Sequence, residues 1–348
     1  MGDLLSRIEI TKLAHELGAP EGDLAFLTAS SPAEIRELRQ IAQTALFARN
    51  EDRVKLLAAL SRMLPVSLTA KIAEFALGPM LSARVAGVLD PREATRLAGH
   101  LDSGFLARLA PSLDPSRVAP IVRGLADPLV VEVGRMLLEQ DEHLTLSRFV
   151  SVVDVSVAMG VVADATGADL LQVAIYCDEP AALDAIAQRL PDRMLADIIT
   201  AASDASLYDA AVSLLASLSQ DVCTRLVGQI GAVPDEAREE LIAAVAHHDV
   251  WPNVLPALHS VDPDVLKAMV NVPITMDPEL VDRVVAHART LDVAPVLVQI
   301  VLAFDDEHLD VLRDSKALRS AELQDWLVTN AGVGTRLIVP VLEALGLR

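Results

Sequence analysis

Cysteine and aromatic residues are scarce in this chain. Among its 348 residues there are two cysteines, Cys177 and Cys223, and aromatic side chains account for 3%. Neither cysteine has a second cysteine at metal-ligand spacing, which excludes a cysteine metal site. We expect both to be buried thiols in a reducing compartment, and the lack of a signal-peptide pattern at the N-terminus predicts a cytoplasmic protein.

The chain also has no long uncharged apolar run. Its hydrophobic fraction is 52% and its mean hydropathy is +0.39, carried mainly by Ala, Val and Leu. The most apolar stretch, 149–176, is interrupted by Asp154, Asp164 and Asp169. Because a membrane span needs roughly 18 apolar residues without charges, we expect no membrane-spanning segment.

Basic residues are outnumbered, and their distribution is uneven. The chain has 29 Lys and Arg against 49 Asp and Glu, which gives a net charge of −20. Residues 1–125 hold 15 basic and 14 acidic residues, so residues 126–348 hold 14 and 35 and carry −21. This balance argues against nucleic acid as a partner and is compatible with a basic protein or a divalent cation. The same acids could equally serve as helix caps and as a solvated face, and this alternative stays open.

Catalytic motifs are missing as well. The chain has no Gly-x-Ser-x-Gly elbow, no Walker lysine loop and no Cys-x-x-Cys pair. The glycine pair at Gly332 and Gly334 follows no expected strand, and we interpret it as a turn. Because no nucleophile, base and orienting residue are suggested together, we expect a non-enzymatic protein that needs no cofactor.

What the chain does contain is a repeat. Leu89-Asp90-Pro91 and the residues up to Leu101 match Leu113-Asp114-Pro115 and the residues up to Leu125, at an offset of 24. An aspartate at the N-cap accepts a hydrogen bond from a first-turn amide, and a proline at N1 needs no acceptor, so Asp-Pro marks a helix start. Asp-Pro returns at 127, 262 and 277, and acids recur mostly every 12–15 residues.

This spacing predicts an all-α protein. We expect a right-handed α-solenoid, or superhelix, built from short helical hairpins of about 24–29 residues. Residues 1–50 are expected to form an N-terminal helical cap and 51–348 the helical-repeat array, with candidate subdivisions near 126 and at 246–260. The valine-rich segment 150–162 supports a rival interpretation, because β-branched residues favour the strands of an α/β unit.

The helix starts resemble those of a known family. Leu89-Asp90-Pro91, Leu113-Asp114-Pro115 and Ala126-Asp127-Pro128 are similar to the intracellular N-terminal domain of the MgtE-type magnesium transporters, a superhelix of very short helices. The resemblance covers roughly 70–220, and these 348 residues contain no counterpart of the family's transmembrane domain or CBS pair. It therefore implies a fold and a cation-responsive acidic surface, and it does not imply transport.

Two near-identical segments contain candidate metal ligands. Gln140-Asp141-Glu142-His143-Leu144 and Asp305-Asp306-Glu307-His308-Leu309 combine carboxylates, which suit hard cations, with histidine, which suits transition metals. The candidates are Asp141, Glu142, His143, Asp305, Asp306, Glu307 and His308. The alternative is that acids in a first helical turn simply complement the helix dipole, which requires no metal.

Residues 246–259 depart most from the repeat. Tryptophan is enriched at interface hot spots, so we take Trp251 and Trp326, together with His247 and His248, as candidate contact residues. The alternative is that Trp251 fills a gap between units where two prolines interrupt regular packing.

These observations favour a non-enzymatic helical-repeat binding or scaffold protein that offers an acidic surface to a protein partner. The alternative is a ligand-responsive module. Such a module would be either a divalent-cation sensor on the acidic face or a carrier of an apolar small molecule in a channel of the superhelix.

Overall fold

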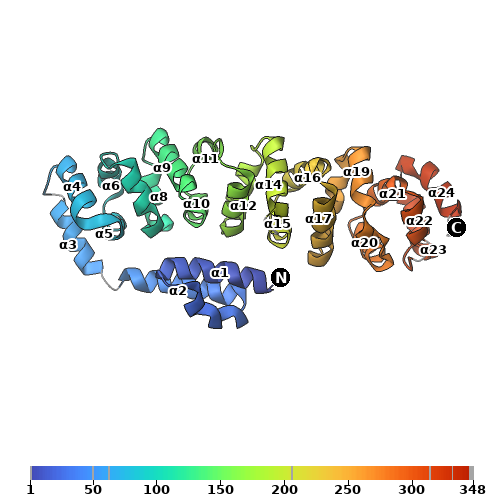
Figure 1. Ribbon diagram of the computed structural model, residues 1–348, viewed down its shortest axis with the longest axis horizontal. Coiled ribbons are helices and arrows are strands. Elements are labelled where there is room, and N and C mark those ends of the chain that lie inside the picture. The colour runs from blue at the N-terminus through green and yellow to red at the C-terminus, as the bar shows by residue number, and fades with distance from the viewer. Residues whose placement is uncertain are drawn as a thin grey trace. The chain divides into compact units, whose positions relative to one another are not determined.

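The protein is built from short helices joined by turns. The computed structural model describes residues 2–48, 51–61, 63–204, 207–312, 315–330 and 332–344. Within these ranges the chain forms 24 α-helices and no β-strand, which confirms the all-α prediction (Figure 1). The chain divides into two compact units, unit 1 (Met1–Ile186) and unit 2 (Ala187–Arg348). The boundary near residue 50 and the subdivisions near 126 and at 246–260 stay predictions.

In unit 1 the first two helices are the longest, and those that follow have 7 to 13 residues. The α-helices are α1 (Gly2–Leu17), α2 (Pro32–Ala48), α3 (Glu51–Ser61), α4 (Val66–Ile72), α5 (Gly78–Ala86), α6 (Pro91–Ala98), α7 (Ser103–Leu109), α8 (Pro115–Val122), α9 (Asp127–Glu139), α10 (His143–Phe149), α11 (Val155–Val162), α12 (Gly167–Tyr176) and α13 (Pro180–Ala187), the last of which ends one residue into unit 2. Two 3-10 helices, η1 (Glu21–Ala29) and η3 (Ala110–Ser112), and one π-helix, η2 (Ala73–Leu77), lie between them.

Unit 2 continues the pattern with less regular lengths. Its α-helices are α14 (Asp192–Asp204), α15 (Tyr208–Leu215), α16 (Gln220–Gln229), α17 (Asp235–His248), α18 (Trp251–Val254), α19 (Pro263–Val270), α20 (Pro278–Thr290), α21 (Ala294–Ala303), α22 (Asp306–Leu312), α23 (Ala321–Asn330) and α24 (Thr335–Ala344). Its 3-10 helices are η4 (Ile230–Ala232), η5 (Leu255–Ser260), η6 (Pro273–Met276) and η7 (Gly332–Gly334).

Most Asp-Pro pairs start helices in the expected way. The carboxylates of Asp90, Asp114, Asp262 and Asp277 each accept a backbone N–H of the first turn that follows. Asp127 is an exception, because α9 begins at Asp127 itself and Ala126 occupies the N-cap without a side-chain bond. The Asp-Pro rule therefore identified the helix but placed its cap one residue late.

The valine-rich segment is helical, so the α/β alternative is wrong. It contains α11, which packs closely on α9 through two glycines. A Cβ atom at Gly134 would lie 2.5 Å from Val161 Cγ2, and one at Gly160 would lie 2.8 Å from Val131 Cγ2. Because neither glycine has a side chain, α9 and α11 can approach closely, and the side chains of Val161 and Val131 pack against the two glycines.

Many α-helices pack on the second α-helix further along the chain. In unit 1 these pairs include α4 with α6, α5 with α7, α7 with α9 and α10 with α12, and in unit 2 they include α14 with α16 and α15 with α17. In unit 1, side-chain bonds from Thr95, Arg123 and Arg135 reach carbonyls 26, 29 and 25 residues later, and Arg148 reaches carbonyls 37 and 35 residues earlier. In unit 2, Arg238 and Asn271 reach carbonyls 30 and 32 residues later. These bonds join neighbouring hairpins, and the hairpin length of 24–29 residues stays a prediction.

The first two helices of unit 1 have a small core of their own. Ile10, Leu13, Leu27 and Ile35 are buried together between α1, η1 and α2, and α1 also packs against α12. Of all helices in the described ranges, none is both long and apolar enough to cross a membrane.

Candidate functional site

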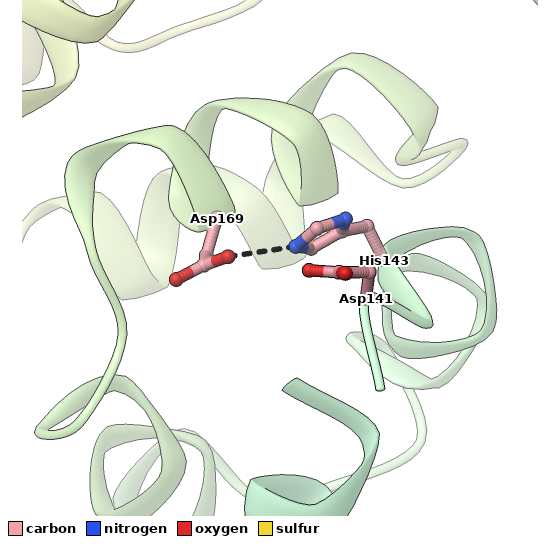
Figure 2. A group of neighbouring side chains, drawn as sticks. All are labelled: Asp141, His143 and Asp169. Atoms are coloured by element: carbon pink, nitrogen blue, oxygen red, sulfur yellow. Dashed lines mark hydrogen bonds and ion pairs between the residues drawn. The ribbon is translucent and has the colours of Figure 1, made fainter. Parts of the chain in front are cut away.

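Asp141, His143 and Asp169 form a group of potential metal donors in unit 1. Asp141 lies between α9 and α10 in a left-handed backbone conformation with φ of 56°, and His143 is the first residue of α10. Asp169 is in the first turn of α12. Figure 2 shows the carboxylate of Asp141 beside the His143 ring, with Asp169 approaching from the neighbouring helix. The packing of α10 on α12 thus brings together residues 26 positions apart.

The three side chains offer one imidazole nitrogen and two carboxylate oxygens, all within 4.8 Å of one another. A mixed nitrogen and oxygen donor set suits a borderline cation such as Zn²⁺ or Mn²⁺ better than Mg²⁺ or Ca²⁺, which prefer oxygen alone. The sequence suggested Asp141 and His143 as ligands, but Asp169 was noted only as a charge that interrupts the apolar stretch 149–176. Glu142 is not part of the group, and its carboxylate accepts a bond from the Thr145 hydroxyl at 2.8 Å.

Asp169 also has a purely structural role. It forms a reciprocal capping box with Thr166 at the start of α12, and its Oδ1 lies 2.8 Å from His143 Nε2. Burial opposes ionisation of this carboxyl, but the bonds from Thr166 and then from His143 outweigh it, so the pKa of Asp169 lies below its ordinary value. The side chain is therefore an anion that ties α12 to α10 and could also coordinate a cation.

The second segment, Asp305 to Leu309, lies in unit 2 and is arranged differently. Asp305 caps α22 by accepting the backbone N–H of His308 at 3.0 Å, and its Oδ1 lies 2.7 Å from His308 Nδ1. The other ring nitrogen of His308 lies 3.2 Å from the carbonyl of Val272. The backbone N–H of His308 is the main reason why the pKa of Asp305 is lowered. Asp306 and Glu307 join no group of three donor side chains among the described residues.

Two of the candidate contact residues of unit 2 bond to other elements. His248 Nε2, on α17, lies 2.7 Å from Asp209 Oδ1 on α15, and Trp326 Nε1 donates to Asp292 Oδ1, between α20 and α21, at 3.3 Å. The rings of His247 and His248 meet edge-on with centroids 5.0 Å apart. Trp251 is only 7% exposed and presents little surface to a partner.

A buried cluster of charges joins α1 and α2 to the end of α12. Lys12 Nζ donates to Glu9 Oε1 at 3.3 Å and to Asp178 Oδ1 at 2.7 Å. Arg39 donates to Asp178 Oδ2 at 2.8 Å and to Glu16 Oε1 at 3.3 Å. Arg36 donates to Glu9 Oε1 at 3.0 Å. Three acids and three bases therefore balance in what we call the charge cluster: Glu9, Lys12, Glu16, Arg36, Arg39 and Asp178.

Burial shapes the ionisation of this cluster. It raises the pKa of Glu16, although Arg148 and Arg39 act in the opposite direction. For Asp178 burial is outweighed by Lys12 and then by Arg39, so its pKa is lowered. The sequence did not predict the cluster, because its members are up to 166 residues apart. A signal in the sequence was the pair Glu9 and Lys12, two charged residues next to the apolar residues Ile10 and Leu13 of α1.

Large apolar side chains are exposed mainly within residues 1–80. In 1–50 the exposed ones include Phe26 at 72% and Ile41 at 59%. At the start of the array Phe75 is 86% and Met63 is 80% exposed, and Leu56, Leu68 and Met80 are also exposed. They lie on or beside α3, α4, η2 and α5, which pack on one another. We call these five side chains the apolar surface of α3–α5. Outside residues 1–80, the only large hydrophobic residues exposed in the described ranges are Leu302 and Leu337.

Comparison with known proteins gives no independent assignment of these features. No protein-family model and no curated protein matches the chain.

Proposed function

We propose that the chain is a non-enzymatic binding or scaffold protein of the helical-repeat type, which holds a protein partner. The packing of many helices on the second α-helix further along the chain supports an α-solenoid, which we propose is right-handed. The Asp-capped starts of α6 and α8 support the resemblance to the MgtE-type N-terminal domain as a proposal about fold. A cytoplasmic location is part of the proposal.

The apolar surface of α3–α5 is the observation that carries this proposal. Each Å² of apolar area removed from water gains about 25 cal/mol, so exposed phenylalanine and methionine side chains favour association. Exposed acids are well solvated and need no partner. Phe75 lies in the π-helix η2, and π-helical turns occur frequently at functional sites. For these reasons the proposal rests on the exposed apolar side chains around Phe75, and the net charge of the chain is a secondary argument.

Charge suggests what the partner is like. Residues 49–84 contain six basic and three acidic residues, whereas residues 126–348 carry −21. The complementary partner is a protein with an apolar stripe flanked by acids, which would cover the apolar surface. We propose that the acidic surface of residues 126–348 is a second contact, for a basic region of the same partner.

Substitution of Phe75 and Met80 by serine is expected to release the partner. Loss of two interface anchors costs about 2 kcal/mol or more, so the recovered partner should fall at least about tenfold. The measurement is quantitative mass spectrometry of proteins that co-purify with the tagged chain from its native host. Light scattering of the same preparations reports whether the partner is a second copy.

The matched control is the pair Leu302→Ser and Leu337→Ser, which removes two exposed leucines from unit 2. The control variant should retain the partner. Equal recovery from both variants, or no stoichiometric partner with the unaltered chain, would contradict the proposal.

The second candidate function is a divalent-cation sensor, which the Asp141, His143 and Asp169 group favours. His143 and Asp169 join α10 to α12, so an ion bound there would change how firmly two neighbouring helices are held together. A binding event could thus be transmitted to the packing of unit 1.

Zinc is expected to stabilise the protein if this group binds metal. At a free concentration about 100 times its Kd, a ligand contributes about 2.7 kcal/mol, which should raise the melting temperature by several degrees. The measurement is thermal unfolding with ZnCl₂ or MgCl₂, and only zinc should be effective. His143→Gln should abolish the shift. His287→Gln, which alters a histidine paired with Asp249 outside any such group, should preserve it. A zinc shift of the same size in both variants would remove this candidate.

A further inference from the structure

Five of the six residues of the charge cluster belong to the first two helices of the chain. These residues, three basic and two acidic, lie on α1 and α2: Glu9, Lys12, Glu16, Arg36 and Arg39. The sixth residue, Asp178, lies in the connection between α12 and α13. We call α1, η1 and α2 (residues 2–48) the arm. The arm supplies one more positive than negative charge to the cluster, and Asp178 from outside the arm brings the sum to zero.

The arm is held together by contacts of its own. Among the described residues its apolar core consists of arm residues: Ile10, Leu13, Leu27 and Ile35, with Leu24 and Ala42 packed against them. Both acids also have basic partners within the arm at 3.0 to 3.3 Å: Glu9 with Lys12 and Arg36, and Glu16 with Arg39. The arm can therefore separate from α12 and α13 with its apolar core and its internal ion pairs intact.

The carboxylate of Asp178 closes the charge cluster from the solvent side. Its Oδ1 accepts a bond from Lys12 Nζ at 2.7 Å, and its Oδ2 accepts one from Arg39 at 2.8 Å. The side chains of Lys12 and Arg39 are 5% and 8% exposed, whereas that of Asp178 is 33% exposed. Two buried bases that bind both oxygens of an accessible carboxylate have the donor arrangement of a carboxylate-binding site.

We infer that the arm binds an acidic side chain of a partner protein between Lys12 and Arg39, and that Asp178 occupies this site as an autoinhibitory contact. The ligand is an aspartate or glutamate, because one negative charge neutralises the site and two oxygens engage the two bases. Asp178 belongs to the same chain, so it competes with the advantage of an intramolecular ligand. A partner that replaces it must present further acids or further contacts, and its binding releases the arm from α12. This inference does not depend on the apolar surface of α3–α5, whose residues lie outside the arm.

The first test removes the internal carboxylate and supplies another in solution. Spin labels on Gln40→Cys in α2 and Glu139→Cys in α9, both exposed positions, report the distance between the arm and its neighbours, with Cys177 and Cys223 replaced by alanine. Asp178→Ala should broaden and lengthen the single short distance of the parent chain. Sodium acetate should restore the short distance, and sodium chloride at the same concentration should not.

The matched control is Glu179→Gln, which removes the neighbouring exposed acid and should leave the distance unchanged. An unchanged distance in Asp178→Ala, or equal recovery with acetate and chloride, would overturn the inference.

The second test offers the site a peptide ligand. The probe is a fluorescent peptide of residues 172–183 with Cys177→Ser, and its binding to the full chain is measured by anisotropy. It should bind the Asp178→Ala chain at least about tenfold more tightly than the unaltered chain, whose own Asp178 competes. The same peptide with Asp178→Asn should bind neither chain tightly. Equal affinity of the two peptides for the Asp178→Ala chain would also overturn the inference.

Discussion

Substitution of Glu9 by glutamine is expected to loosen the attachment of α1 and α2 to the rest of unit 1. The Glu9 side chain is only 3% exposed and lies within 3.3 Å of charged groups on Lys12, Arg36 and Arg39. Glutamine has the same shape as glutamate but no charge. The three basic side chains of the charge cluster are then left with two acids, Glu16 and Asp178. Removal of one partner from a buried ion pair typically costs about 3–5 kcal/mol, and we expect about 3 here because Asp178 still binds Lys12 and Arg39.

Hydrogen exchange measures this effect locally. A loss of about 3 kcal/mol should accelerate exchange in α1 and α2 by about two orders of magnitude. Glu37→Gln is the control, because it makes the same change at an exposed position of α2 and should alter stability by less than about 0.5 kcal/mol. If both variants exchange like the unaltered protein, the charge cluster does not hold these helices in place.

Substitution of Phe105 by alanine is expected to be the most destabilising single change in the array of unit 1. Phe105 is 2% exposed and packs with Ala73, Ala83 and Leu109 between α7 and the helices before it. Leu101 and Leu113 pack against the same cluster, so the ring lies at the centre of a closed apolar core. Truncation of a buried phenylalanine costs about 3–5 kcal/mol, which includes the cavity left behind.

The damage should remain local. In repeat arrays each element contacts only its near neighbours, so a weakened element opens without unfolding the whole chain. We expect faster hydrogen exchange in α5 and α7 and unchanged exchange in unit 2. Phe75→Ala removes the same side chain from an exposed position and should change stability by less than about 0.5 kcal/mol. Uniformly faster exchange across both units would show that the chain unfolds as a single cooperative body.

Local signals in the sequence predicted the helices well. Asp90 and Asp114 act as N-caps, and this property depends only on residues within one turn. The strand alternative for 150–162 failed because β-propensity at valines was overridden by packing, with Gly134 and Gly160 giving two helices room to approach. The length of the repeated unit, 24–29 residues, stays a prediction.

The candidate site could be predicted only in part, for the same reason. Asp141 and His143 are neighbours in the sequence, but Asp169 joins them only because α10 packs on α12. Similarly, the bond between Lys12 and Asp178 connects distant parts of the chain. Pairings of this kind depend on tertiary packing, which helix caps and periodicity do not encode. Trp251 was singled out from its surroundings with two open roles, a contact residue or a side chain that fills a gap between units, and in the structure it is 7% exposed.

The most direct test of the central claim is hydrogen exchange of the full chain with and without its co-purified protein partner. We expect slower exchange in α3, α4, η2 and α5, because the partner covers the apolar surface of α3–α5. Additional protection within residues 126–348 would report the second, acidic contact. Protection confined to unit 2, with none in residues 66–86, would contradict the claim that this surface binds the partner.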